Sequence, residues 1–189
     1  MTAPVPGHGH LGPAVDRVDL WAERRLDLLR GDPLFDRVFA TASHAGDFSL
    51  VWHAIGVGRG LVLRRPDQAI VLAALLGVES LLVNQGLKRL FRRERPTLAG
   101  DDHHRLRRPS TSAFPSGHAS SAAFAATILT AWDGPRIGTL WWTIAAIVGT
   151  SRVYVRIHHA SDVVGGALVG IGLGIAGRAV AARVIRRRR

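Results

Sequence analysis

Residues 115–162 read PSGHASSAAFAATILTAWDGPRIGTLWWTIAAIVGTSRVYVRIHHASD: two apolar blocks joined by a short turn, with a polar motif at each outer end. The blocks cover Gly117–Trp132 and Ile137–Thr150, and neither contains Asp, Glu, Lys or Arg. Their length and composition predict helices, and tryptophans flank the turn Asp133–Arg136, as they do at membrane interfaces. A helical hairpin returns the chain to the face where it started, so both outer motifs are expected at one level.

The composition of the whole chain favours a membrane protein. The chain has 189 residues, which suits one domain, and it combines 47% apolar residues with a net charge of +11. Its basic residues flank apolar blocks, and nothing resembles a nucleic-acid module, so we expect no nucleic-acid partner. The absence of cysteine excludes a disulfide framework, a cysteine metal site and a cysteine nucleophile. No cleavable signal peptide is expected at the N-terminus.

Three further apolar blocks bring the expected number of transmembrane helices to five. They are Phe48–Leu63, Ala69–Leu87 and Val163–Ile185. Most blocks are shorter than the roughly 20 residues that cross the hydrocarbon, and tilt or local thinning of the bilayer covers the shortfall. The predicted fold class is therefore an all-α integral-membrane bundle. In the last block Gly166, Gly170 and Gly174 recur every four residues, which predicts close helix packing.

The N-terminal part differs from the apolar blocks. Residues 1–13 are rich in Pro, Gly and His and are expected to be a disordered tail, followed by one membrane domain over 14–189. Residues 14–40 alternate apolar and charged side chains, which predicts an amphipathic helix broken near Gly31-Asp32-Pro33. This segment is too charged to cross a bilayer and is expected at the interface or against the bundle.

Three motifs at the ends of apolar blocks carry the chemistry: residues 88–96 (KRLFRRERP), 115–118 (PSGH) and 151–162 (SRVYVRIHHASD). Lys88, Arg95 and Arg152 supply fixed positive charge and N–H donors for a tetrahedral oxyanion. Ser116-Gly117-His118 begins a helix, where free backbone N–H groups favour phosphate, and Gly117 lets the backbone approach closely.

Two histidines and one carboxylate complete the set. His158 and Asp162 are four residues apart and share a helix face if the helix begins that early. A carboxylate bonded to one ring nitrogen fixes the tautomer and leaves the other nitrogen as a nucleophile. His118 comes from a different element and can act as an acid and then as a base.

Together the motifs resemble the type-2 phosphatidic acid phosphatase superfamily, which also includes soluble acid phosphatases and vanadium haloperoxidases. Its pattern is Lys, six residues, Arg-Pro; then Pro-Ser-Gly-His; then Ser-Arg, five residues, His, three residues, Asp, and all three parts match between about Asn84 and Gly166. The family typically has six spans, so the amphipathic segment is expected to replace the first.

The resemblance implies a role for each site residue. His158 is the nucleophile, Asp162 orients it, and His118 protonates the leaving group and then activates water. Phosphate oxygens are bound by Lys88, Arg95, Ser116, Gly117 and Arg152. The resemblance implies no metal and no other cofactor, and a site on the extracytoplasmic face of the cell membrane.

The implied substrate is a lipid phosphate, either a monoester or a pyrophosphate, on a polyprenyl or glycerolipid. An alternative is a polyprenyl-phosphate-sugar phosphatase of cell-wall synthesis, such as a decaprenylphosphoryl-5-phosphoribose phosphatase. A vanadate-dependent haloperoxidase fits less well, because those enzymes are large and soluble. The oligomeric state is not encoded in any pattern.

Other polar residues have simpler interpretations. Glu79 lies inside a span and is expected to pair with an arginine. His159 adjoins the nucleophile and is expected to have at most a supporting role. Lipid headgroup contacts are favoured for Arg89, Arg92, Arg93 and Arg156. A solvated loop is favoured over a metal site for Asp101, Asp102, His103 and His104.

Overall fold

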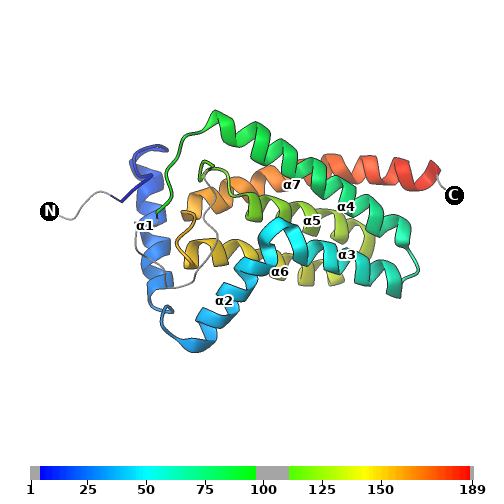
Figure 1. Cartoon of the computed structure of the whole chain (residues 1–189), viewed down its shortest axis with the longest axis horizontal. Helices are drawn as coiled ribbons and strands as arrows, with labels where there is room; N and C mark the ends of the chain where they lie inside the picture. The colour runs from blue at the N-terminus through cyan, green and yellow to red at the C-terminus, as the bar shows by residue number, and fades with distance from the viewer. Residues whose placement is uncertain (1–4, 97–110, 188–189) are drawn as a thin grey trace.

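A computed structural model describes residues 5–96 and 111–187, and the regular elements of these residues are all helical (Figure 1). Helix α1 (Pro13–Asp27) lies across one end of the molecule, and α2 (Pro33–Gly46) leads from it towards the bundle. The predicted break between them is confirmed: the side chain of Asp32 accepts from Leu34 N at 2.8 Å and caps α2.

The remaining helices run along the long axis of the molecule. Helix α3 spans Leu50–Val62, and α4 (Pro66–Leu81) continues into a π-helical turn η2 (Leu82–Gly86) and a 3-10 turn η3 (Leu87–Leu90). After the undescribed segment come α5 (Gly117–Asp133), α6 (Pro135–Tyr154) and α7 (Ala160–Arg187). Another 3-10 turn, η1 (Asp47–Ser49), joins α2 to α3.

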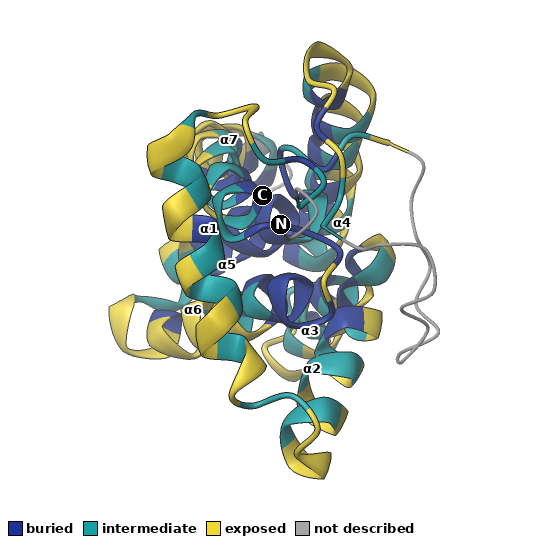
Figure 2. Ribbon diagram, turned by 90° about the vertical axis from the view of Figure 1, so that its left-hand side faces the viewer, coloured by how far each residue is buried: buried dark blue, intermediate teal, exposed yellow. Residues whose placement is uncertain are grey.

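Helix α5 is the centre of the bundle and packs most closely against α7. Eleven of its residues are buried, from Ala119 to Leu129, and most of these side chains are alanine or serine. A Cβ atom on Gly170 would lie 2.1 Å from the carbonyl oxygen of Ser120, so the backbones touch there. The prediction of close packing along the glycine repeat of α7 is therefore confirmed. Seen from the α1 end, buried residues gather at the centre and exposed residues at the periphery (Figure 2).

The outer surface of the bundle is apolar. Two helical segments among the described residues, Pro66–Leu90 and Ala160–Arg186, are long and apolar enough to cross a membrane. Less than a third of the most apolar stretch of each segment is buried within the protein. Further exposed apolar side chains lie on α3 and α6: Leu50, Val57, Leu61, Val62, Ile137 and Leu140. The all-α fold is confirmed, but only two segments among the described residues meet the length and hydropathy criteria, so the predicted count of five spans is not confirmed.

Candidate active site

The three motifs meet at the end of the bundle that α1 crosses, around a cavity of about 330 Å³. Lys88 from η3, His118 from α5, Arg152 from α6 and His158 from the α6–α7 loop all line this cavity. The hairpin of α5 and α6 returns the chain to its starting level, which is why residues far apart in sequence come together here.

The ring of His158 is buried and its tautomer follows from its neighbours. Its Nε2 lies 3.1 Å from Nη1 of Arg95. A guanidinium can only donate, so Nε2 carries the lone pair and Nδ1 carries the proton. Nδ1 faces Oδ2 of Asp162 at 3.5 Å. Burial, followed by the charges of Arg95 and Arg152, lowers the pKa of His158 well below its usual value, so the ring is neutral near pH 7.

Asp162 is fully buried in the first turn of α7 and joins two motifs. Its Oδ2 accepts from the backbone N–H of His159 at 2.9 Å, and its carbonyl accepts from Ser116 N, also at 2.9 Å. Because α7 begins at Ala160, His158 precedes the helix. The condition for a shared helix face is therefore not met, and the pair is formed by a carboxylate that reaches back over the loop.

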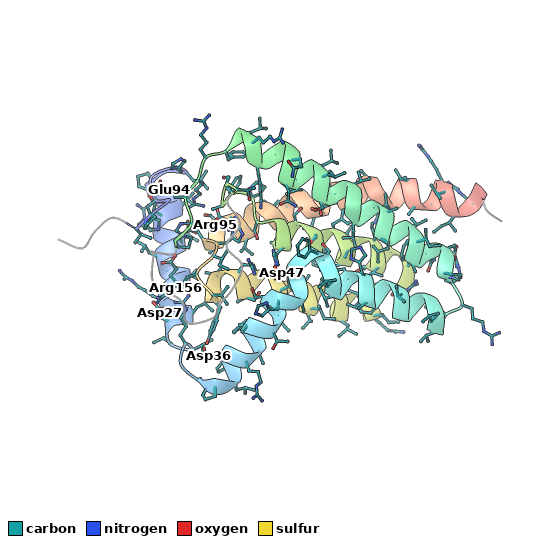
Figure 3. All side chains as sticks on the ribbon, viewed as in Figure 1. Asp27, Asp36, Asp47, Glu94, Arg95 and Arg156 are labelled. Carbon is teal, nitrogen blue, oxygen red and sulfur yellow. The ribbon has the colours of Figure 1, made fainter. Side chains whose placement is uncertain are left out.

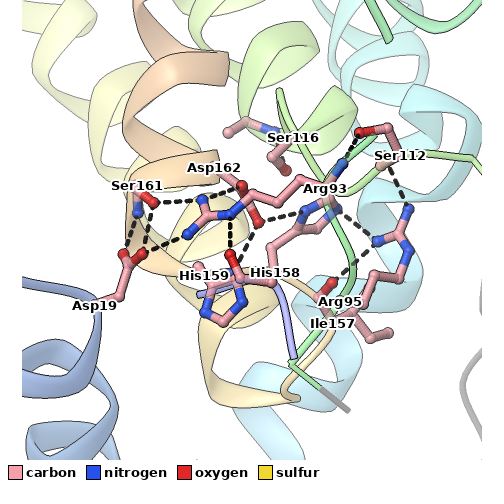
Figure 4. A network of polar contacts seen from close by, with 12 residues as sticks. Asp19, Arg93, Arg95, Ser112, Ser116, Ile157, His158, His159, Ser161 and Asp162 are labelled. Atoms are coloured by element: carbon pink, nitrogen blue, oxygen red, sulfur yellow. Dashed lines mark hydrogen bonds and ion pairs between the residues drawn. The ribbon is translucent and has the colours of Figure 1, made fainter. Parts of the chain in front are cut away.

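Arg93 holds Oδ1, the other carboxylate oxygen of Asp162. This contact corrects the interpretation of Arg93 as a residue that binds lipid headgroups. It is buried, and its guanidinium donates to Asp162 Oδ1 at 2.6 Å and to Asp19 Oδ2 at 2.8 Å (Figure 4). Asp19 also accepts from the backbone N–H of Ser161 at 2.8 Å. Helix α1 thus contributes a buried carboxylate to the support of Asp162, which its amphipathic pattern did not reveal.

The segment before α1 contacts the same loop, so the expected disorder over residues 1–13 does not hold for residues 5–12. Gly7 O accepts from Arg93 Nε at 3.1 Å, and Pro6 O lies 3.0 Å from His159 Nε2. The other ring nitrogen of His159 lies 3.3 Å from Glu23. Tight turns rich in Gly and Pro leave carbonyls unpaired, and here two of them contact buried side chains. The ring of His159 is therefore occupied by Pro6 and Glu23, and His159 contacts Asp162 only through its backbone N–H among the described contacts.

Two cations face the cavity beside Gly117. Arg152 is buried and donates to Ser43 Oγ, while its Nε has no hydrogen-bond partner among the described residues. A buried donor without a partner is costly, which favours an anion here. A Cβ on Gly117 would lie 2.9 Å from Asn84 Oδ1 and 3.6 Å from Lys88 Nζ, so glycine keeps this wall open.

Ser116, predicted to bind phosphate, has a different contact in the structure. It is fully buried, and its hydroxyl accepts from Ala119 N at 3.5 Å as the cap of α5. The lining of the cavity includes its neighbours Gly117 and His118. Its place in the motif is therefore explained by the helix terminus that it caps.

A carboxylate that the sequence analysis missed contacts His118. Asp47 lies in the turn between α2 and α3 (Figure 3), and its Oδ1 is 3.0 Å from His118 Nε2. The hydrogen bond from His118 is the largest of the effects that lower the pKa of Asp47, which is therefore ionised near pH 7. Phe48 and Ser49 follow with φ of 51° and 59°. Such strain in consecutive non-glycine residues is typical of functional sites.

The other predicted polar residues have mixed outcomes. Glu79 is buried, and its carboxylate accepts from Ser120 Oγ; no arginine in the described part of the chain pairs with it. Arg89 and Arg156 are exposed, with contacts to Gln85 and Asp27. Arg92 is exposed too. The cluster Asp101, Asp102, His103 and His104 lies outside the described residues.

Comparison with known proteins identifies a family. The model of the PAP2 superfamily matches residues 68–186. Phosphatidylglycerophosphatase B from Bacillus subtilis (strain 168) is 28% identical, over 84% of this chain and 80% of its own length. Decaprenylphosphoryl-5-phosphoribose phosphatase from Mycolicibacterium smegmatis is 32% identical, over 66% of this chain and 67% of its own.

The fold is shared with a solved structure. The transmembrane PAP2-type phosphatidylglycerolphosphate phosphatase from Bacillus subtilis superposes with a TM-score of 0.69 and 26% identity, over 90% of this chain and 87% of that one. Other curated relatives, named as undecaprenyl-diphosphatases, match less completely: the chain spans 56% and 54% of their lengths.

Proposed function

The chain belongs to the PAP2 superfamily, and from this premise we propose that it is a multi-pass membrane lipid phosphatase. His158 takes the phosphoryl group of the substrate and then passes it to water. The observation that carries the proposal is the state of His158: a neutral ring with its Nε2 lone pair beside Arg95, at a cavity lined by Lys88 and Arg152.

In the first step Nε2 of His158 attacks phosphorus, and the bond between phosphorus and the leaving oxygen breaks. Arg95 Nη1, now bonded to Nε2, passes to a phosphoryl oxygen as the N–P bond forms. Asp162 stabilises the positive charge that develops on the ring, and Arg93 holds the carboxylate in place. Preorganised charge of this kind is usually the largest contribution to phosphoryl transfer.

The phosphoryl oxygens are stabilised by fixed donors of the protein. Lys88, Arg95 and Arg152 supply the positive charge, and the free backbone N–H groups at the start of α5 add the positive end of a helix dipole. Arg152 Nε is the donor whose partner the phosphoryl group would supply. These groups meet the charge of the transferring group without a divalent ion.

His118 moves the protons. As an imidazolium it bonds to Asp47 through Nε2 and gives the Nδ1 proton to the leaving oxygen. In the second step the neutral ring takes a proton from water as the water attacks the phosphohistidine. The N–P bond then breaks and inorganic phosphate leaves. Ionised Asp47 favours the protonated ring that the first step requires.

We infer a lipid substrate because the cavity lies in a bundle with an apolar surface. A site on the extracytoplasmic face is proposed because the family that the motifs resemble usually has its site there. The absence of cysteine makes this placement simple to test. Arg92→Cys marks the site end of the bundle, and Arg64→Cys marks the opposite end; both positions are exposed. A membrane-impermeant maleimide applied to intact cells should label Arg92→Cys alone. Labelling of Arg64→Cys alone would reverse the orientation.

The activity is tested by phosphate release from lipid phosphates by the purified chain, with EDTA or orthovanadate added. We expect release that EDTA does not reduce and that vanadate inhibits, because five-coordinate vanadate on His158 resembles the transition state. Dependence on added magnesium together with indifference to vanadate would contradict the mechanism.

A further inference from the structure

Two buried carboxylates share one arginine behind His158. Arg93 Nη1 donates to Asp162 Oδ1 at 2.6 Å, and Arg93 Nη2 donates to Asp19 Oδ2 at 2.8 Å (Figure 4). The three side chains are at most 1% exposed. One guanidinium balances only one carboxylate, so this group keeps one unbalanced negative charge. Because burying an unbalanced charge costs free energy, packing alone does not explain the second carboxylate.

Asp19 is an unusual residue for its place in the fold. Of the fifteen residues of α1, all within the described part of the chain, only Asp19 is buried. A helix that only covered the bundle would be expected to bury an apolar side chain there. The carboxylate instead accepts from Ser161 N at 2.8 Å and from Ser161 Oγ at 2.7 Å. The described residues that line the cavity do not include Asp19, so it reaches the reaction only through its neighbours.

Arg93 affects the charge of Asp162 as well as its position. Asp162 Oδ2 faces His158 Nδ1 at 3.5 Å, while Oδ1 is bonded to Arg93. The guanidinium fixes the carboxylate, but its positive charge also cancels part of the field of Asp162 at His158, because buried charges are little screened. Asp19, bonded to the other nitrogen of Arg93, offsets that positive charge. Asp162 is then held by an arginine and still acts on His158 as a negative group.

The first step of the reaction uses this negative charge. The bond between Nε2 of His158 and phosphorus forms, and the bond between phosphorus and the leaving oxygen breaks. Nδ1 keeps its proton, so the ring becomes a cation. A negative charge beside Nδ1 stabilises this cation and the transition state that leads to it, relative to the neutral ring. Asp19 is therefore expected to affect the rate of phosphoryl transfer and not the binding of the substrate.

We propose that Asp19 is a positioning residue for phosphoryl transfer: it offsets the charge of Arg93, so that Asp162 is fixed in place and still presents a negative charge to the ring of His158. The inference rests on the proposed phosphatase function and adds a residue to it. Asp19 lies outside residues 68–186, which match the family model. Helix α1 is thereby part of the catalytic unit, in addition to covering the end of the bundle.

A charge-removing substitution measures the contribution of Asp19. In Asp19→Asn the unbalanced negative charge is lost, and we expect phosphoryl transfer to slow by about tenfold to a hundredfold, the range found for groups that support metal ligands in a comparable way. The rate is measured as single-turnover consumption of a lipid monophosphate by an excess of the full-length chain in detergent micelles. The chain concentration at half saturation should stay within about twofold of wild type. The control is Asp133→Asn, which takes a carboxylate from Arg59 outside this network and should keep the wild-type rate.

A second substitution distinguishes charge balance from a structural role. Asp19→Asn combined with Arg93→Gln removes one charge of each sign, so Asp162 again presents an unbalanced negative charge. We expect this double variant to transfer the phosphoryl group at least about threefold faster than Asp19→Asn alone. If Asp19 only held the start of α7, the second loss would add to the first and the double variant would be slower. A double variant no faster than Asp19→Asn, or a wild-type rate in Asp19→Asn, would overturn the inference.

The remaining outcomes also decide the matter. If Asp19→Asn yields no folded protein, the double variant is compared with wild type directly. A rate within about a hundredfold of wild type would support the inference, and a larger loss, approaching the roughly 10⁴ expected for Asp162→Asn, would overturn it. Failure of both variants to fold would overturn it too, since a structural role would then account for Asp19. A wild-type chain that hydrolyses no lipid phosphate would contradict the phosphatase function, and this inference with it.

Discussion

Both ends of the bundle hold arginines that are largely or fully buried, but the partners of these arginines differ. At the end away from the cavity, Arg59 from α3 donates to Asp133 at 2.7 and 3.0 Å, and Trp141 Nε1 donates to the same carboxylate at 3.0 Å. At the cavity end Arg93 is matched by Asp19 and Asp162, but Arg152 bonds to the neutral hydroxyl of Ser43 and keeps an Nε without a described partner.

This difference separates a structural contact from a binding site. An arginine whose charge and hydrogen bonds are matched by a carboxylate holds helices in register, and its charge needs no ligand to balance it. A buried cation with a neutral partner, beside a cavity and a neutral histidine, favours an anion. The following variants test the distinction, from the largest expected effect to the smallest.

Replacing the nucleophile should have the largest effect. We expect His158→Ala to abolish turnover, because no other group at that position can accept the phosphoryl group. Phosphate release from a lipid monophosphate, measured with folded protein from size-exclusion chromatography, provides the measurement. A His158→Ala enzyme with wild-type kcat would exclude His158 as the nucleophile.

The same carboxylate-to-amide change at each end of the bundle tests the difference between the two ends most directly. Asp162→Asn should lower kcat by about 10⁴, as in a comparable protease triad, because an amide favours the wrong tautomer of the histidine. The fold should persist, since the amide oxygen of the new side chain can still accept from Arg93 or from the backbone N–H of His159. The control is Asp133→Asn at the far end. If the two variants lost the same fraction of kcat, Asp162 would have no special relation to the chemistry.

Asp47→Asn should have an intermediate effect. Asp47 is ionised and hydrogen-bonded to His118. Removing its charge therefore destabilises the protonated form of His118, which donates the proton to the leaving oxygen. We expect kcat to fall by roughly 10²-fold or less, and the alkaline limb of the pH–rate profile to move to lower pH. Asp67→Asn, in a half-buried pair with Arg65 away from the cavity, is the control. An unchanged profile in Asp47→Asn would leave Asp47 with a structural role only.

Asp133→Asn should have the smallest effect on catalysis and a clear effect on stability. Breaking this largely buried pair leaves Arg59 without its carboxylate and costs at most about 3–5 kcal/mol, the range for fully buried pairs. We expect a lower thermal midpoint, while kcat per folded molecule stays within about twofold of wild type. Thermal unfolding and kcat are measured on the same preparation. A large loss of kcat without a change in the midpoint would link this end of the bundle to the chemistry.

The sequence predicted the meeting of the three motifs because each adjoins the end of an apolar block, and helical hairpins fix the face on which such ends lie. It could not predict Asp19, Asp47 or the role of Arg93. Their contacts join residues 74, 71 and 69 positions apart, and no local period encodes them. Arg93 in particular is one of several arginines in its motif, and only tertiary packing separates the buried one from the exposed ones.

His158 and Asp162 are neighbours, as their spacing suggested, but the helix face on which that suggestion depended does not form. A spacing of four suggested one helix face, yet α7 begins only at Ala160. Asp162 reaches the loop because it accepts from the backbone N–H of His159, as a residue near a helix start often does. Similarly, apolar composition predicted helices correctly, but it did not fix how many of them cross the bilayer.

The central claim is that the phosphoryl group is carried by His158, and isolation of the intermediate tests it most directly. His118→Ala should slow the hydrolysis of the intermediate, while an aryl phosphate with a good leaving group still phosphorylates the enzyme. Peptides from alkali-quenched protein, read by mass spectrometry, should then carry phosphate on His158. Phosphate on His159, or turnover of the aryl phosphate with no phosphorylated peptide at all, would contradict the account.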